Sequence, residues 1–328
     1  MGWVGLEVPD AVSLKTTVSD ILDKKVSKGE NYNTYAGLVY IYGFAYIALS
    51  KNFLLTNFLL LAVAAVSFSK VICSVCDDFS NVAIAVIFAC FCFNPYVLAV
   101  FDFPNKEIPI FALLNVAIYF LLVRNNFVAA FLFLLPIYWV RDGYFWIASG
   151  TFLLCFLTAG VHKWMRPFVI LTAILVFILM PVEVLGYGDS AMKRSLDTVE
   201  ILRGSGVVIH ADFLARLYYT ILSFALFNPV FELGGKFIFL NFGYFLLGLV
   251  IVGYFGKILT RENVAKFLEN DLDFILLMQI LMLSFGLNIQ PRYIFPLICF
   301  MVASIFSGRS NYLMPVVFIT CIFNFYII

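Results

Sequence analysis

The sequence predicts an all-α fold, that of a polytopic integral membrane protein with about 10–12 transmembrane helices and one long extracytoplasmic loop. The 328 residues are 63% hydrophobic and 12% charged, with a mean hydropathy of +1.00. A soluble domain carries about 25% charged residues, roughly twice this fraction. The apolar residues form runs of roughly 15 to 20, the length that crosses about 30 Å of hydrocarbon. These runs are continuous and do not alternate with polar residues, so they predict helices.

The apolar runs define the expected spans. They lie, in chain order, near 54–73, 81–101, 108–123, 126–140, 144–161, 166–182, 237–256, 272–288, 293–308 and 311–328. Two further segments have a weaker pattern. Residues 36–50 are short and rich in tyrosine, and residues 211–227 carry Asp212 and Arg216 beside paired tyrosines. We expect 211–227 to lie along the membrane interface instead of crossing it.

The remaining segments are polar connections within one membrane domain, residues 1–328. Residues 1–33 form a polar N-terminal segment that lacks the basic-then-apolar order of a signal peptide. The long outer loop, 183–210, exceeds what a simple connection needs. Within it, apolar residues of 189–203 recur at helical spacing and predict a short amphipathic helix on the membrane surface.

Basic connections set the expected orientation in the cell inner (cytoplasmic) membrane. Residues 161–167, 256–266 and 308–311 are such connections, and all three face the cytoplasm only if 211–227 does not cross. That orientation places the long loop 183–210 outside. The same outer face then receives the charged positions Lys106, Arg141 and Arg292.

Four places set ionisable groups against apolar runs. They hold Asp102, Lys106 and Glu107; Arg141 and Asp142; Arg194, Arg203 and His210 in the long loop; and Arg292, which Tyr293 follows. Charges at helix ends commonly extend toward lipid headgroups, and Arg141 with Asp142 could equally form a local ion pair in a turn. Arginine, however, holds phosphate through two parallel hydrogen bonds. A cluster of cations on the outer face therefore suits a lipid-linked pyrophosphate, with Arg292 as one phosphate ligand.

Aromatic residues flank Arg141 and Asp142 in the sequence. They are Tyr138, Trp139, Tyr144 and Trp146. Such residues usually form an interfacial belt, and less often stack on sugar rings.

Several other functions are excluded by composition and motif. The net charge of +1 and the absence of a long basic run argue against nucleic acid binding. Common nucleotide-binding, zinc-protease and serine-hydrolase motifs are absent from the sequence. Cys73 and Cys76 form one C-x-x-C, but without a second pair or a nearby histidine we expect buried, hydrophobic cysteines and no metal. No cofactor is expected either.

Four stretches carry a family resemblance. They are NPYVLAVFDFPNKEIPIFALLNVAIYFLL, LLPIYWVRDGYFWI, FLARLYYTILSFALFNPVFEL and PRYIFPLICFM, within residues 31–328. In their order the chain resembles bacterial oligosaccharide repeat-unit polymerases of O-antigen and capsule pathways, and related C-type membrane glycosyltransferases. Each stretch is short and degenerate.

The resemblance implies transfer of a glycan from a polyprenyl-pyrophosphate carrier to an acceptor sugar at the outer face. Membrane lipids and glycan-assembly proteins would be the other partners. The implied catalytic residues are Arg141 and Arg292, which stabilise the departing pyrophosphate, and Glu107 or Asp142 as the base. The implied substrate-binding residues are Lys106, Arg194, Arg203, His210 and Tyr293. Three alternatives are a transferase using a polyprenyl-phosphate sugar, a lipid-linked sugar flippase or transporter, and a non-catalytic assembly partner.

The chain departs from that family in two respects. It starts after the point where a first spanning helix and an acidic outer loop are usual, with Asp10 as the candidate acid. Arg194 and Arg203 do not clearly meet the family's paired Arg-to-Gly spacing. These departures fit a divergent relative, or an incomplete or inactive one.

Overall fold

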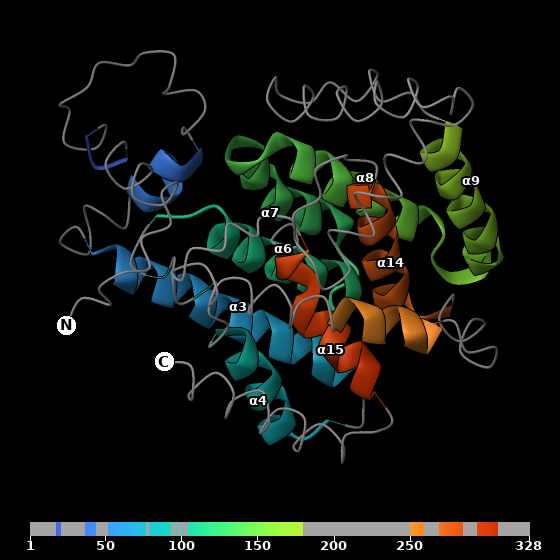
Figure 1. Ribbon diagram of the computed structural model, residues 1–328, viewed down its shortest axis with the longest axis horizontal. Helices are drawn as coiled ribbons and strands as arrows, with labels where there is room; N and C mark the ends of the chain where they lie inside the picture. Colours follow the sequence, from blue (N-terminus) through green and yellow to red (C-terminus); the bar gives the residue numbers. More distant parts are fainter. Residues whose placement is uncertain are drawn as a thin grey trace, which may run out of the picture. The chain divides into compact units, whose positions relative to one another are not determined.

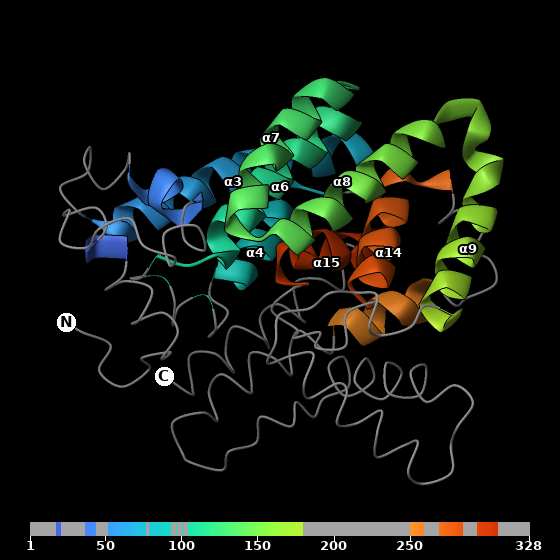
Figure 2. The same ribbon diagram turned by 90° about the horizontal axis from the view of Figure 1, so that it is seen from above.

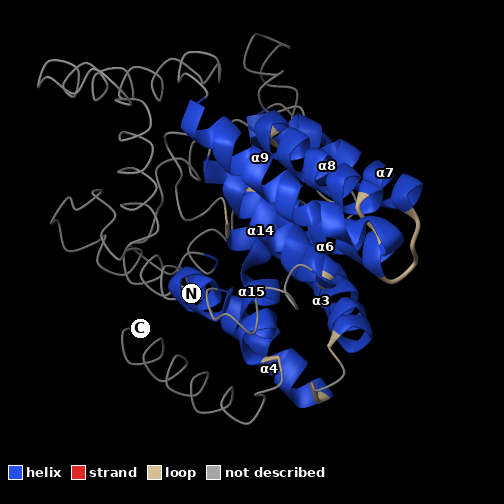
Figure 3. Ribbon diagram, turned by 90° about the vertical axis from the view of Figure 1, so that its right-hand side faces the viewer, coloured by secondary structure: helices blue, strands red, loops and turns tan. Residues whose placement is uncertain are grey.

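All secondary structure in the described part of the chain is helical. The computed structural model describes residues 18–20, 37–43, 52–76, 79–92, 97, 101, 104–179, 250–258, 269–284 and 294–307. Figure 1 shows the helices in chain order, and Figure 3 shows no strand among the described residues. The predicted all-α class is therefore confirmed.

The helices coincide with the expected apolar segments. They are α3 (Phe53–Val75), α4 (Asn81–Cys92), α6 (Glu107–Leu122), α7 (Phe127–Val140), α8 (Asp142–Leu157), η1 (Gly160–Met165), α9 (Arg166–Leu179), α14 (Asp271–Ser284), η4 (Phe295–Leu297) and α15 (Ile298–Phe306). Shorter helical pieces cover 37–43 and 250–258. Each expected span overlaps one of these helices except 311–328, which lies outside the described residues, as do 183–210, 211–227 and most of the span 237–256.

Helix length bears directly on the expected membrane crossings. Among the described residues, α3 is the one helix that is long and apolar enough to cross a membrane, with 23 residues. The apolar helices α6, α7 and α8 have 16, 14 and 16 residues. At 1.5 Å per residue the longest of these extends about 24 Å. The number of crossings therefore stays a prediction.

Asparagine side chains accept from first-turn amides of four helices, among them α14, where Oδ1 of Asn270 accepts from the Leu272 amide at 2.9 Å. The Oδ1 atom of Asn52 accepts from the Leu55 amide at 3.1 Å, that of Asn105 from Ile108 at 2.8 Å, and that of Asn126 from Ala129 at 2.9 Å. Each bond satisfies an amide that has no partner within its own helix. In the turn between α6 and α7, Asn125 adopts a φ of 50°, a conformation that asparagine tolerates better than most residues.

The chain forms two compact units. The first comprises 1–149, 232–243 and 295–328, and the second comprises 150–231 and 244–294. In the first unit α6 lies between α3 and α7, and it also packs against η4 (Figure 1). The helix α15 packs beside α4 and α3 (Figure 2).

An aromatic cluster joins four helices in the core of the first unit. The ring of Phe68 in α3 lies 6.0 Å from Phe88 in α4 and 5.1 Å from Phe300 in α15. Phe88 lies 5.9 Å from Phe111 in α6. Phe68, Phe111 and Phe300 are fully buried. Because buried aromatic rings contribute large apolar areas, this cluster is a principal source of packing between these helices.

In the second unit α14 is the buried helix and packs against α9. Residues 272–280 are buried without interruption, as expected for a helix that is apolar around most of its circumference. The helical piece 250–258 also contacts α14. The hydroxyl of Tyr254 in this piece donates to the backbone carbonyl of Asp273 at 3.1 Å.

Candidate functional site

Two of the predicted catalytic residues, Glu107 and Arg141, meet at one end of the α6–α7 pair. These consecutive helices are antiparallel neighbours joined by a short turn, so the start of α6 and the end of α7 lie at the same end. The Nη2 atom of Arg141 lies 3.5 Å from Oε1 of Glu107. The glutamate side chain is 8% exposed and the arginine side chain 21%. A buried carboxylate is thus paired with a cation that solvent still reaches.

A buried hydrogen-bond network holds the chain just before Glu107. The Tyr42 hydroxyl donates to Oδ1 of Asn57 at 2.6 Å and accepts from the amide of Asn105 at 3.2 Å. The side-chain amide of Asn57 donates to the carbonyl of Phe101 at 2.7 Å. Tyr42 and Asn57 are fully buried. Since Asn105 also accepts from the Ile108 amide in the first turn of α6, this network fixes the position from which Glu107 projects.

A close backbone contact fixes the other side of the pair. A Cβ atom added to Gly37 would lie 2.3 Å from the carbonyl carbon and oxygen of Trp139 and 2.6 Å from the nitrogen of Val140. The helical piece 37–43 therefore touches the backbone of α7 directly before Arg141. Only glycine allows two backbones to approach so closely.

Exposed aromatic rings surround the α7–α8 junction. Tyr138 contacts Trp139, Phe145 and Trp146, with ring centroids 5.6–6.3 Å apart. The side chains of Tyr138, Trp139 and Trp146 are 45%, 52% and 64% exposed. Three of the four predicted belt aromatics are thus on the surface next to Arg141. The fourth, Tyr144, is buried, and its hydroxyl has no hydrogen-bond partner among the described residues.

Two further predicted site residues, Asp142 and Lys106, lie in the described part of the chain. Asp142 opens α8 and is exposed, and its Oδ1 accepts from the amide of Gly143 at 2.8 Å. The alternative of a local ion pair between Arg141 and Asp142 is not found, and Arg141 instead contacts Glu107 of α6. Lys106 directly precedes Glu107 and is half-buried. The remaining predicted residues lie outside the described part of the chain: Arg194, Arg203, His210, Arg292 and Tyr293.

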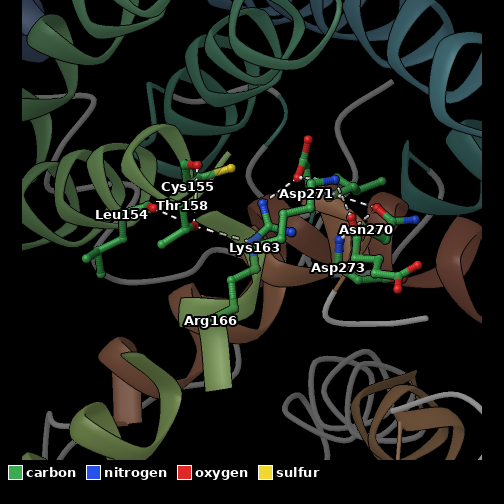
Figure 4. A network of polar contacts seen from close by, with 10 residues as sticks. Leu154, Cys155, Thr158, Lys163, Arg166, Asn270, Asp271 and Asp273 are labelled. Carbon is green, nitrogen blue, oxygen red and sulfur yellow. Dashed lines mark hydrogen bonds and ion pairs between the residues drawn. The ribbon is translucent and has the colours of Figure 1, made fainter. Parts of the chain in front are cut away.

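A second ionic cluster, in the second unit, was not predicted. Arg166, which opens α9, is fully buried and pairs with Asp271 at the start of α14 (Figure 4). Its Nε atom donates to the Thr158 hydroxyl at 3.3 Å, and its guanidinium carbon lies 4.6 Å from the ring centroid of Phe274. The Nζ atom of Lys163 lies 3.3 Å from Oδ1 of Asp271. These contacts compensate a charge that burial would otherwise make costly.

The sequence holds one signal for this cluster, a basic residue at the start of an apolar helix. Arg166 belongs to the basic connection 161–167, but a cation at a helix N-terminus opposes the helix dipole and therefore favours a compensating anion nearby. The Nζ atom of Lys163 also donates to the backbone carbonyl of Glu269 at 2.6 Å. The membrane face on which the basic connections 161–167 and 256–266 lie stays a prediction.

The described residues offer no metal site. Among them there is no group of three or more histidine, cysteine, aspartate or glutamate side chains that could hold an ion. The cysteines described as free are Cys73, Cys76, Cys92, Cys155 and Cys299. Chemically, the Glu107–Arg141 pair offers a partly accessible cation for an anionic group and a carboxylate beside it.

Comparison with known proteins adds no relative. No protein-family model, curated protein or solved structure matches the chain.

Proposed function

We propose that the chain is a multi-pass protein of the cytoplasmic membrane that polymerises an O-antigen- or capsule-like polysaccharide. It would transfer a lipid-pyrophosphate-linked glycan to an acceptor sugar at the outer face. The observation that carries the proposal is the Glu107–Arg141 pair, which combines a partly exposed guanidinium with a buried carboxylate at one helix-bundle end. The network at Tyr42 and the exposed rings beside Arg141 support the same assignment.

The membrane location is supported by the exposed faces of the helices. Large apolar side chains are exposed along α3, α7, α8 and α9, including Phe58, Val66, Leu132, Trp146, Phe156, Phe168 and Leu171. After Arg166 the sequence of α9 contains no charged residue. Exposed apolar surface on this scale is costly in water and stable against lipid.

The proposed chemistry uses both members of the pair. The acceptor hydroxyl oxygen forms a bond to the anomeric carbon while the bond from that carbon to the pyrophosphate oxygen breaks. The lipid pyrophosphate leaves with the electron pair, and the hydroxyl proton passes to Glu107. Arg141 stabilises the charge that develops on the leaving group, with Arg292 as the second expected cation and Lys106 assisting. The rings of Tyr138 and Trp146 offer faces on which sugar rings can stack.

The experiment is deletion of the gene in the strain that carries it, with lipopolysaccharide or capsule resolved by length on a gel. If the protein is a polymerase, the deletion strain should lose the long chains and retain a single repeat unit. Complementation with the wild-type chain should restore the long chains, and complementation with Arg141→Ala should not. An unchanged banding pattern after deletion would reject the proposal in favour of a non-catalytic partner.

A flippase for lipid-linked sugars is the second candidate, and the observation that favours it is the fully buried Arg166, which pairs with Asp271. A fully buried charge beside an apolar helix, such as that of Arg166, is typical of transport pathways. Deletion of a flippase predicts complete loss of surface glycan, including the single repeat unit. The same gel therefore separates the two candidates.

A further inference from the structure

Two buried polar side chains in the second unit have no protein partner. The hydroxyl of Thr151 in α8 and both amide atoms of Gln279 in α14 find no hydrogen-bond partner among the described residues. Both side chains are fully buried. Buried polar atoms are nearly always satisfied by protein or by a bound molecule, so three such atoms require an explanation.

Thr151 and, two residues before it, Ser149 lack a bond that other buried hydroxyl residues of the described chain make. Other buried hydroxyl residues on its helices donate to the carbonyl four residues earlier: Thr56 to Asn52 at 3.1 Å, Ser67 to Val63 at 2.9 Å and Thr158 to Leu154 at 2.7 Å. This local bond is the usual way for such a group to be satisfied within a helix. Since Thr151 does not make it, its hydroxyl is available to a group outside its own helix.

Two contacts show that Thr151 and Gln279 lie at the same level of neighbouring antiparallel segments. The first contact runs through Arg166. Its guanidinium donates to the hydroxyl of Thr158, directly after α8, and pairs with Asp271 at the start of α14. Further along, a Cβ atom on Gly150 would lie 3.8 Å from Cε of Met282. Thr151 lies seven residues before Thr158, and Gln279 lies eight residues after Asp271. Both are therefore about 10–12 Å from the ionic cluster along their helices.

We propose that Thr151 and Gln279 together bind one uncharged hydroxyl group, which belongs either to a water molecule or to a sugar or polyol. A buried water makes about three hydrogen bonds, and the two side chains offer three polar atoms. An amide donates and accepts, as a hydroxyl does, so the two are complementary. The group is uncharged because 143–157 and 274–284 contain no charged residue. A bare ion would lack a counter-charge at this level.

The test is a double-mutant cycle on the full chain in lipid nanodiscs, with the thermal unfolding midpoint as the readout. The variants are Thr151→Val and Gln279→Leu, which remove the polar atoms while nearly keeping side-chain volume. If both side chains hold one molecule, each single variant lowers the midpoint and the double variant lowers it no further, because the molecule is already lost. If the atoms are dry and unpartnered, both single variants raise the midpoint. Shifts of either sign that simply add would also overturn the proposal.

A matched control comes from Ser149, whose hydroxyl is also buried without a partner among the described residues. It lies two residues from Thr151 and so points from a different side of α8. Its variant Ser149→Ala should give a shift that adds to that of Gln279→Leu. Should Thr151→Val fail to fold, Thr151→Ser retains the hydroxyl and must leave the wild-type midpoint nearly unchanged. A large drop for serine would show that methyl packing, not hydrogen bonding, determines the result.

The source of the hydroxyl is assigned by adding glucose to the nanodisc samples. A concentration-dependent rise in the midpoint that wild type shows beyond Thr151→Val identifies a sugar hydroxyl. Equal rises in the two proteins, together with the non-additive cycle, identify water.

Discussion

The Nη2 atom of Arg141 lies 3.5 Å from Oε1 of Glu107, and each residue lies at the helix end whose dipole suits its charge. Glu107 is in the first turn of α6, where partial positive charge gathers, and Arg141 follows the last residue of α7. The pair therefore has an electrostatic reason to form whether or not a substrate binds. Substitutions that keep charge but change geometry separate these two roles.

Arg141→Lys should strongly reduce glycan chain length in a deletion strain. Lysine retains the charge that faces Glu107, so the fold should persist, but an ammonium cannot reproduce the two-pronged contact with phosphate. Loss of one charge-assisted hydrogen bond costs about 1.5–3 kcal/mol, or roughly ten- to a hundred-fold in rate. The control is Arg124→Lys, at the opposite end of α6, where Arg124 bonds the Tyr119 hydroxyl. Full-length polymer from Arg141→Lys would show that the arginine only anchors a helix end.

Glu107→Gln should abolish transfer more completely than Asp142→Asn. Both changes remove one negative charge at nearly constant shape, but Glu107 is buried beside Arg141 whereas Asp142 is exposed and bonded to the amide next to it. A base must reach the hydroxyl proton from a fixed position. The measurement is chain length on the same gel, with membrane levels of each variant checked by immunoblot. The reverse ranking would assign the base to Asp142.

Gly37→Ala should destabilise the protein by about 1–3 kcal/mol, the usual cost of overpacking. The new methyl group would lie 2.3 Å from backbone atoms of Trp139, which cannot move aside as a flexible side chain can. Gly143→Ala is the matched control, because a Cβ there meets nothing within 4 Å. Alanine is also the better helix former by about 1 kcal/mol. Thermal unfolding in detergent should thus give shifts of opposite sign, and equal shifts would show that the 37–43 contact is dispensable.

Asp271→Asn should destabilise the chain more than Arg166→Met. The first change leaves a fully buried guanidinium without its carboxylate, which costs about 3 kcal/mol or more. The second leaves only a carboxylate that is 37% exposed and can be hydrated, while methionine fills part of the buried volume. Lys163→Ala, which removes a partly exposed partner, should cost below about 1 kcal/mol. Chemical denaturation of the three variants measures the order, and a greater loss for Arg166→Met would show that the cation's packing dominates.

Cysteine labelling should find residues 185–208 reachable from outside the cell and residues 258–266 only after permeabilisation. This pattern follows from keeping 211–227 out of the membrane, so that the basic connections share the cytoplasmic face. The background is a chain whose native cysteines are replaced and which still complements the deletion. Labelling of both segments from one side would mean that 211–227 crosses, and that Arg141 and Arg292 do not share a face.

Sequence reasoning located the helices because apolar runs and their polar breaks are local signals. The break at Arg141 and the start of α6 at Glu107 both occur where the pattern put them. Contacts between distant residues have no such local signal. Nothing near Gly37 in the sequence points to Trp139, and the burial of Arg166 depends on Asp271, which is far along the chain. The charge rule for membrane loops counted Arg166 correctly as a cation but could not show that it pairs inside the protein.

The contact between Gly37 and Trp139 also has a consequence for how the protein is made. The two residues are separated by 102 positions, so at about 5–20 residues per second the piece 37–43 waits roughly 5–20 s for its neighbour to be synthesised. Both partners of the Tyr42 hydroxyl are synthesised within that interval, Asn57 before Asn105. Arg141 is synthesised last among the residues of the Glu107–Arg141 pair and the buried network beside it, so the pair can form only after α7 has been made.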